Sequence, residues 1–190
     1  MSKKVLVPLA KGFEEIEAVS IIDVLRRAEI DVVVAALSDE MLVQGANGIT
    51  IKADAKVADF SADTLDMVVL PGGWDGTYAL ADDANVQKLL QDMDAKGKNI
   101  GAICAAPFAL NKAGVLKENY TCYPSVEEQI RAEGYQGDRA MVVEDANVMT
   151  SRGPATALCF ALEIVKKLEG EEKYNTLREG LLATYCQSSK

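Results

Sequence analysis

The sequence predicts an α/β fold of the flavodoxin-like type, with helices on both faces of a doubly wound, mostly parallel sheet. Two observations indicate this fold. Strand-like segments alternate with helical segments along the chain, and the strand-like segments are apolar throughout, as parallel strands buried on both faces are. The length of 190 residues suits one domain of this kind, so we expect a single domain over residues 1–190.

The first half of the chain begins with a strand–helix–strand unit. Glu14 and Glu15 open the helical segment as ordinary first-turn acids and two arginines close it, which matches the helix dipole. A hairpin follows around Asn47 and Gly48, a dipeptide suited to the positive φ angles of tight turns, and we expect it to extend from one edge of the sheet. In order, we predict a strand at 5–9, a helix at 14–28, a strand at 31–36, the hairpin at 42–53, a polar connection at 54–66 and a strand at 67–70.

The second half opens on the glycine turn PGGWDG, after which no helix is expected to begin at once. Amphipathic spacing then predicts a helix that ends at Gly97, and the alternation continues toward the C-terminus. In order, we predict a helix at 85–96, a strand at 99–103, a helix at 105–113, a strand at 120–123, a helix at 126–133, strands at 140–143 and 147–150, and helices at 155–168 and 173–182.

Composition excludes several classes of function. The net charge is −9 and the sequence pI is about 4.6, so we expect no basic surface for nucleic acid or anionic lipid. The apolar run near the N-terminus is too short for a signal sequence or a membrane span, and we expect a cytoplasmic protein. The PGG turn does not match GxGxxG, so we expect no dinucleotide and predict no other cofactor.

The four cysteines, at 104, 122, 159 and 186, form no CxxC pair, and the chain has no histidine. We therefore expect no metal site, and free thiols in a reducing compartment. Cys159 lies among apolar residues and is expected in the core, whereas Cys186 is expected in a C-terminal tail. Hydrolases based on a Cys–His or Ser–His pair are excluded unless another residue serves as the base.

Cys104 is the first candidate catalytic residue, because it lies where an apolar strand joins an alanine-rich helix. A side chain at such a turn points into the crevice at the carboxyl ends of the strands. The nearby helix N-terminus favours thiolate over thiol. The alternative is that Cys104 is a small buried hydrophobic residue, as free cysteines often are.

Glu17 is the second candidate, because helical spacing places it within an apolar arc with Ile21 and Val24. A buried carboxyl group either has partners or stays protonated. It could simply accept a hydrogen bond from a backbone N–H of the preceding loop. The functional alternative is a neutral acid that donates a hydrogen bond to a nearby anion. Because the strands beside both residues should lie centrally in the sheet, we pair Glu17 with Cys104.

The glycine turn supplies candidate backbone donors. We expect the N–H groups of Gly72 and Gly73 to face the same crevice, where with the N–H of Ala105 they could bind an oxyanion. The alternative is that the two glycines only make a turn.

Four blocks, AKGFEEIEAV, VLPGG, AICAAP and TSRGP, together resemble the ThiJ/PfpI family, the family of the Parkinson-disease-associated protein deglycase. They agree with it in order and spacing over nearly the whole chain, and the match is nearest to the small single-domain members. The resemblance places the family's glutamate at Glu17, its cysteine at Cys104 and its amide donors at Gly73 and Ala105. It also implies a strained, readily oxidised cysteine hydrogen-bonded by a protonated glutamate, and homodimers formed through the first helix and the hairpin.

Tyr123 stands where several relatives carry a histidine near the cysteine. A phenol has an ordinary pKa of about 10, so Tyr123 can bind a ligand by donating a hydrogen bond but is a poor base at neutral pH. Peptidase members need their histidine, so we expect no peptidase activity.

The resemblance implies an enzyme that acts on 2-oxoaldehydes such as methylglyoxal, or on their adducts with amines and thiols. It would be a glutathione-independent glyoxalase or a deglycase in which Cys104 attacks the aldehyde and Glu17 moves protons. The alternative is an oxidative-stress sensor or holdase-like chaperone switched by oxidation of Cys104. A third hypothesis is a ligand-binding module with an inert cysteine.

Overall fold

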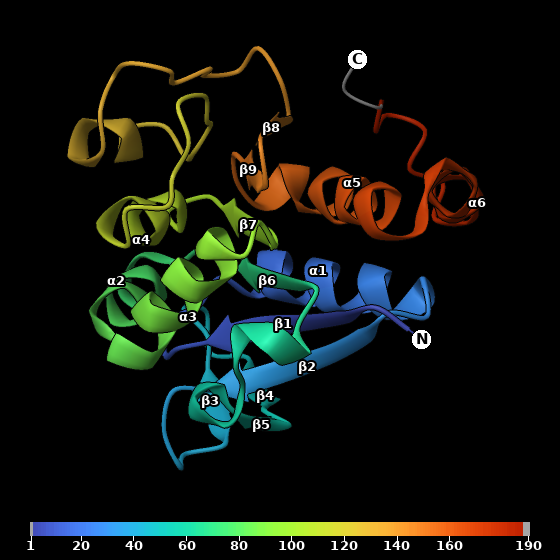
Figure 1. Ribbon diagram of the computed structural model, residues 1–190. Helices are drawn as coiled ribbons and strands as arrows, with labels where there is room; N and C mark the ends of the chain where they lie inside the picture. The colour runs from blue at the N-terminus through green and yellow to red at the C-terminus, as the bar shows by residue number, and fades with distance from the viewer. Residues whose placement is uncertain (1, 188–190) are drawn as a thin grey trace.

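A seven-stranded sheet forms the centre of residues 2–187, the part of the chain that the computed structural model describes (Figure 1). Its strands are β1 (Lys4–Leu9), β2 (Asp31–Ala36), β5 (Ala55–Lys56), β6 (Met67–Leu70), β7 (Asn99–Ile103), β8 (Val142–Asp145) and β9 (Val148–Ser151). The strand order is β5-β2-β1-β6-β7-β9-β8, and neighbours are parallel except β8 with β9. The order reverses between β1 and β6, which confirms the doubly wound α/β prediction.

Helices cover both faces of this sheet (Figure 1). One layer contains α1 (Glu15–Arg27), α5 (Ala157–Glu169) and α6 (Glu171–Gly180), and the other contains α2 (Trp74–Asp82), α3 (Ala84–Ala95) and α4 (Pro107–Lys112). Within β1, Val5 and Val7 pack into the first layer and Leu6 into the second, which explains why the strand is apolar throughout. None of the helices described is long and apolar enough to span a bilayer.

The predicted hairpin is present as β3 (Leu42–Gln44) and β4 (Thr50–Lys52), but it forms a separate two-stranded sheet instead of extending the main one. Glu15 fixes its loop. The carboxylate accepts hydrogen bonds from the backbone N–H of Asn47 at 2.6 Å, from Asn47 Nδ2 at 3.0 Å and from the N–H of Ile49 at 3.4 Å. Glu15 is buried, so its interpretation as an ordinary first-turn acid is wrong.

Helix α2 begins at Trp74, immediately after the glycine turn, where no helix was expected. Gly73 makes this possible, because its φ of +91° turns the chain in a region that L side chains rarely adopt. A Cβ atom at Gly73 would also lie 2.3 Å from the carbonyl oxygen of Gly12. Helix α4 begins at Pro107, two residues later than predicted, because Ala105 and Ala106 form the turn after β7.

The strand expected at 120–123 is reduced to a single bridge between Tyr120 and Tyr135. Its N–H groups bond elsewhere: that of Thr121 donates to Thr150 Oγ1 at 2.9 Å, and that of Tyr123 donates to the carbonyl of Cys104 at 2.9 Å. The helix expected at 126–133 is only the short 3-10 helix η3 (Val126–Gln129). The other 3-10 helices described are η1 (Val57–Asp59), η2 (Ala62–Thr64) and η4 (Pro154–Thr156).

Cys159 and Cys186 form a disulfide, with their Cα atoms 5.1 Å apart. The expectation of free thiols is therefore wrong for this pair, while Cys104 and Cys122 are free. Cys186 is buried instead of lying in an exposed tail, and its carbonyl accepts hydrogen bonds from Tyr174 and Arg178, each at 3.3 Å. The disulfide fastens the segment after α6 to α5.

We expect the substitution Glu15→Ala to lower the free energy of unfolding by roughly 1–2 kcal/mol, because the hairpin loop loses a charged acceptor. Burial alone raises the pKa of Glu15, but hydrogen bonds with Asn47 and Ile49 together bring it below its ordinary value. A lowered pKa means that this contribution is complete above the pKa of an unfolded glutamate, about 4.3, and is lost as the pH falls through the folded pKa.

Urea unfolding at neutral and acidic pH measures both effects. The control is Glu133→Ala, since Glu133 is exposed, and its free energy of unfolding should stay within about 0.5 kcal/mol of wild type. Equal stability of Glu15→Ala and wild type at neutral pH would contradict the assigned role of the carboxylate.

Candidate active site

Cys104 occupies a strained elbow between β7 and α4. Its φ is +64°, which is uncommon for a residue with a side chain and persists only when the surroundings fix the backbone. The N–H of Cys104 donates to the carbonyl of Ser151 at 3.0 Å, and the carbonyl of Cys104 accepts from Tyr123 at 2.9 Å. Both backbone groups are thus held by neighbouring segments. The side chain is 9% exposed, at the carboxyl end of a central strand.

Glu17 lies in the first turn of α1 with no exposed surface. Its Oε2 accepts a hydrogen bond from the N–H of Gly72 at 2.8 Å. Its Oε1 is also buried and has no hydrogen-bond partner among the residues described. The start of the helix is fixed by Glu14, whose side chain accepts from the N–H of Glu17 at 2.8 Å and whose N–H donates to the carbonyl of Gly72 at 2.9 Å.

Gly72 lies between the two candidate residues and lets them approach each other. A Cβ atom on Gly72 would lie 2.6 Å from Cys104 Cβ and 2.7 Å from Glu17 Oε2, closer than side-chain atoms tolerate. The Gly72 N–H was expected to bind an oxyanion, but this N–H donates to Glu17 instead. The glycine is needed here for space, because a larger residue would separate the carboxyl group from the sulfur.

Burial raises the pKa of Glu17 to about 7, although the interaction with the Cys104 side chain and the hydrogen bond from the Gly72 N–H both lower it. Burial and the negative charge of Glu17 also raise the pKa of the Cys104 thiol, while hydrogen bonds from the N–H groups of Gly73 and Ala105 lower it. The predicted lowering of the thiol pKa is therefore wrong, because burial raises the pKa whatever the charge on Glu17. When Glu17 keeps its proton, that repulsion disappears, and the two N–H groups favour a negative charge on the sulfur.

Tyr123 contacts the elbow through its backbone, as described above, and its ring lies against Gly153. A Cβ atom on Gly153 would lie 3.3 Å from Tyr123 Cδ2. The ring is 44% exposed. Trp74 directly follows Gly73, is 41% exposed and was not among the predicted site residues. The signal was present, since a large apolar residue follows the glycine pair.

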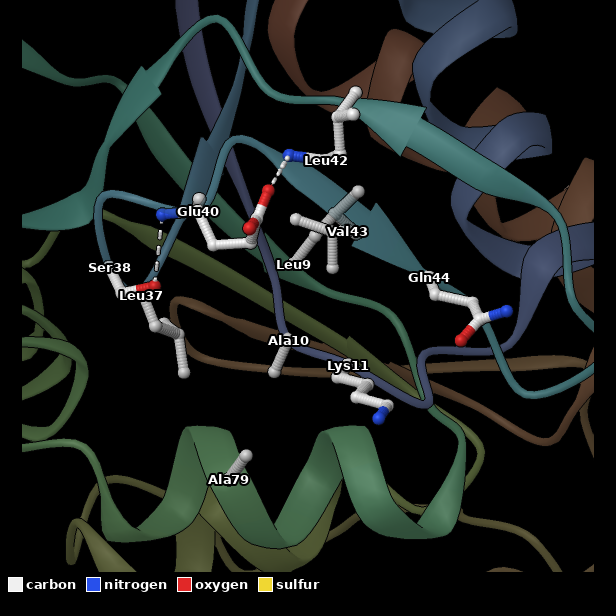
Figure 2. A pocket seen from close by; sticks show the side chains of 11 residues that line it. Leu9, Ala10, Lys11, Leu37, Ser38, Glu40, Leu42, Val43, Gln44 and Ala79 are labelled. Carbon is white, nitrogen blue, oxygen red and sulfur yellow. Dashed lines mark hydrogen bonds between the residues drawn. The ribbon is translucent and has the colours of Figure 1, made fainter.

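A pocket of about 390 Å³ opens beside the hairpin, at the carboxyl ends of β1 and β2 (Figure 2). Lys11 and Gln44 lie on one side of it and Ser38 and Glu40 on the other, with Ala79 of α2 across from them. Neither Glu17 nor Cys104 lines this pocket. Residues 2–187 also contain no group of three side chains of the types that ligate metals.

The model of the DJ-1/PfpI family matches residues 3–167. The chain belongs to the DJ-1/PfpI family. It is 43% identical to Protein dj-1beta of Drosophila melanogaster over 186 residues, which cover 97% of this chain and 100% of that relative. The crystal structure of that protein superposes on this chain with a TM-score of 0.91, and the match covers 96% of this chain and 98% of the chain in the crystal.

Two other members of the family are also similar to the chain. Glutathione-independent glyoxalase DJR-1.2 of Caenorhabditis elegans is 39% identical over 168 residues, which cover 88% of this chain and 89% of that relative. The structure of oxidized Toxoplasma gondii DJ-1 is 38% identical, has a TM-score of 0.90 and covers 95% of this chain and 98% of its own. The predicted resemblance to this family is confirmed.

The charge of Glu17 predicts a pH dependence for the reactivity of Cys104. We expect the rate of alkylation by iodoacetamide to stay low through pH 7, where Glu17 becomes charged and opposes ionisation of the thiol, and to rise only at alkaline pH. In Glu17→Gln the midpoint of this rise should move to lower pH, because an amide never carries the negative charge that raises the pKa of the thiol.

Mass spectrometry of the peptide that contains Cys104 measures these rates separately from those of Cys122. The exposed Glu133→Gln substitution is the control for loss of one surface charge and should leave the midpoint unchanged. Identical profiles for wild type and Glu17→Gln would show that the charge of Glu17 does not act on the thiol.

Proposed function

We propose that this member of the DJ-1/PfpI family converts 2-oxoaldehydes such as methylglyoxal to hydroxy acids without glutathione, or removes them from adducts with amines and thiols. The observation that carries the proposal is the buried carboxyl group of Glu17, with a pKa of about 7 and an unpartnered Oε1, beside Cys104. An acid with a pKa near the working pH is suited to both donating and accepting a proton. The name of the C. elegans relative supports the same class of substrate.

In the proposed mechanism, the sulfur of Cys104 attacks the aldehyde carbon and forms a hemithioacetal. The N–H groups of Gly73 and Ala105, which hydrogen-bond the sulfur, stabilise the oxygen that becomes negative. The alkoxide first takes the proton of Glu17, and the resulting carboxylate removes the proton from the former aldehyde carbon and returns it to the neighbouring carbon. Transfer of the hydroxyl proton to the former ketone oxygen then completes the conversion to a thioester. Water then hydrolyses the thioester to the hydroxy acid and regenerates the thiol. Overall, one aldehyde and one water give one hydroxy acid.

The same arrangement supports a second proposed function, a sensor or holdase-like chaperone switched by oxidation of Cys104. Peroxide would convert the thiol to a sulfenate and then a sulfinate. The N–H groups of Gly73 and Ala105 and a protonated Glu17 could hydrogen-bond the added oxygens. This function requires that the oxidised protein bind an unfolded client that the reduced protein does not bind.

We also propose that the protein forms homodimers through α1 and the hairpin. Ile16 and Val19 on α1 and Ile49 beside the hairpin expose large apolar side chains on this part of the surface.

The proposed nucleophile must stay reduced, which favours a reducing compartment such as the cytoplasm.

The glyoxalase proposal predicts that purified protein forms lactate from methylglyoxal in the absence of glutathione. Cys104→Ala should reduce the rate to background, and Glu17→Gln should lower kcat by about 10²-fold or more, because general acid–base catalysis contributes about 10²–10⁴-fold. Enzymatic detection of lactate measures both.

The matched control is Cys122→Ala. Cys122 is the other free cysteine, and burial, with the charge of Glu127, raises its pKa to about 12, so this variant should retain activity. Turnover by Cys104→Ala equal to that of wild type would exclude the mechanism. A stable gain of two oxygen atoms on Cys104 with mild peroxide, together with new binding of an unfolded client, would favour the sensor.

A further inference from the structure

Three aromatic side chains near the elbow are exposed although the fold buries most of its large apolar residues. Trp74 is 41% exposed, Tyr78 is 39% exposed and Tyr123 is 44% exposed. Their positions do not contribute to either of the two large buried clusters that cover the faces of the sheet. Exposed aromatic groups gathered near a reactive side chain are typical of ligand-binding surfaces.

Trp74 and Tyr123 belong to two different segments whose backbones contact Cys104. Trp74 is the residue after Gly73, whose N–H hydrogen-bonds the sulfur. Tyr123 donates its own N–H to the carbonyl of Cys104 at 2.9 Å. Each aromatic residue is therefore within one position of a backbone group that contacts Cys104.

Tyr78 fixes the position of this aromatic group. Its ring centroid lies 6.1 Å from that of Trp74 and 5.5 Å from that of Phe108 in α4, the latter in an edge-to-face arrangement. Its hydroxyl donates to Gln129 Oε1 at 3.1 Å. Gln129 belongs to η3, the segment that follows Tyr123, so Tyr78 links α2, α4 and η3. Rings that are already held in place lose little entropy when a ligand binds.

We propose that Trp74 and Tyr123 form an aromatic rim that binds the flat substituent of the substrate, so that the enzyme prefers 2-oxoaldehydes with an aryl group over those with a methyl group. The inference rests on the proposed function for the reacting aldehyde, while the rim itself is a binding surface that can be tested without turnover. An aryl group stacked on one ring is expected to improve binding about three- to tenfold.

Phenylglyoxal and methylglyoxal test the preference, because they differ only in the substituent. We expect the ratio of kcat/KM for phenylglyoxal to that for methylglyoxal to fall about three- to tenfold in Trp74→Ala, and to be largely restored in Trp74→Phe. Tyr185→Ala is the control, because Tyr185 is also exposed but is not among the aromatic pairs near the elbow, and this variant should keep the wild-type ratio. An unchanged ratio in Trp74→Ala would overturn the proposal.

Fluorescence provides a second test that does not depend on turnover, since Trp74 is the sole tryptophan of the chain. The probes are phenylethanediol and propylene glycol, the unreactive reduced forms of the two aldehydes, titrated into Cys104→Ala. Phenylethanediol should change the fluorescence saturably, with an affinity about three- to tenfold weaker after the additional substitution Tyr123→Ala and retained with Tyr123→Phe. Propylene glycol should bind more weakly than phenylethanediol.

The two tests separate the failure of the rim from the failure of the proposed chemistry. Saturable binding of phenylethanediol without turnover of either aldehyde would reject the glyoxalase activity and support the rim. Turnover of methylglyoxal with no saturable fluorescence change, or with equal affinity for both diols, would support the chemistry and reject the rim.

Discussion

The candidate site depends on one contact, in which a buried carboxyl group meets a sulfur atom beside a glycine. Water does not reach Glu17, and a single N–H from Gly72 does not compensate for the lost hydration of a full negative charge. The Glu17 carboxyl group therefore keeps its proton up to a pH near neutrality. As a result, the chemistry available to Cys104 depends on how α1 packs, because a small shift of this helix would change both the burial of the acid and its separation from the sulfur.

The topology of the sheet explains why these groups meet. The strand order reverses between β1 and β6, and the connections after β1, β6 and β7 all emerge at the carboxyl ends of neighbouring strands. Each connection supplies one part of the site: Glu17 follows β1, the glycine pair follows β6 and Cys104 follows β7. Backbone hydrogen bonds from Glu14 to Gly72 and from Cys104 to Ser151 join these segments, so the strained elbow is supported by the sheet and not by local sequence alone.

Features set by local pattern could be predicted from the sequence. The apolar runs located the central strands, and helical spacing placed Glu17 on a buried face. Features set by distant contacts could not. The hairpin bonds of Glu15 reach 32 residues along the chain, and the cysteines of the disulfide are 27 residues apart. The pKa of Cys104 depends on the balance between burial, the charge of Glu17 and two N–H groups, which no sequence pattern reports.

The disulfide between Cys159 and Cys186 gives this small domain two sulfur centres with opposite needs. A nucleophilic thiol at Cys104 must be reduced to react, whereas the covalent link between α5 and the segment after α6 exists only while its two sulfurs are oxidised. A reductant strong enough to open the disulfide would release the segment after α6 from α5, which lies against α1, the helix that carries the acid. The redox conditions under which the protein is handled therefore determine both whether Cys104 is reduced and whether the segment after α6 is covalently attached to α5.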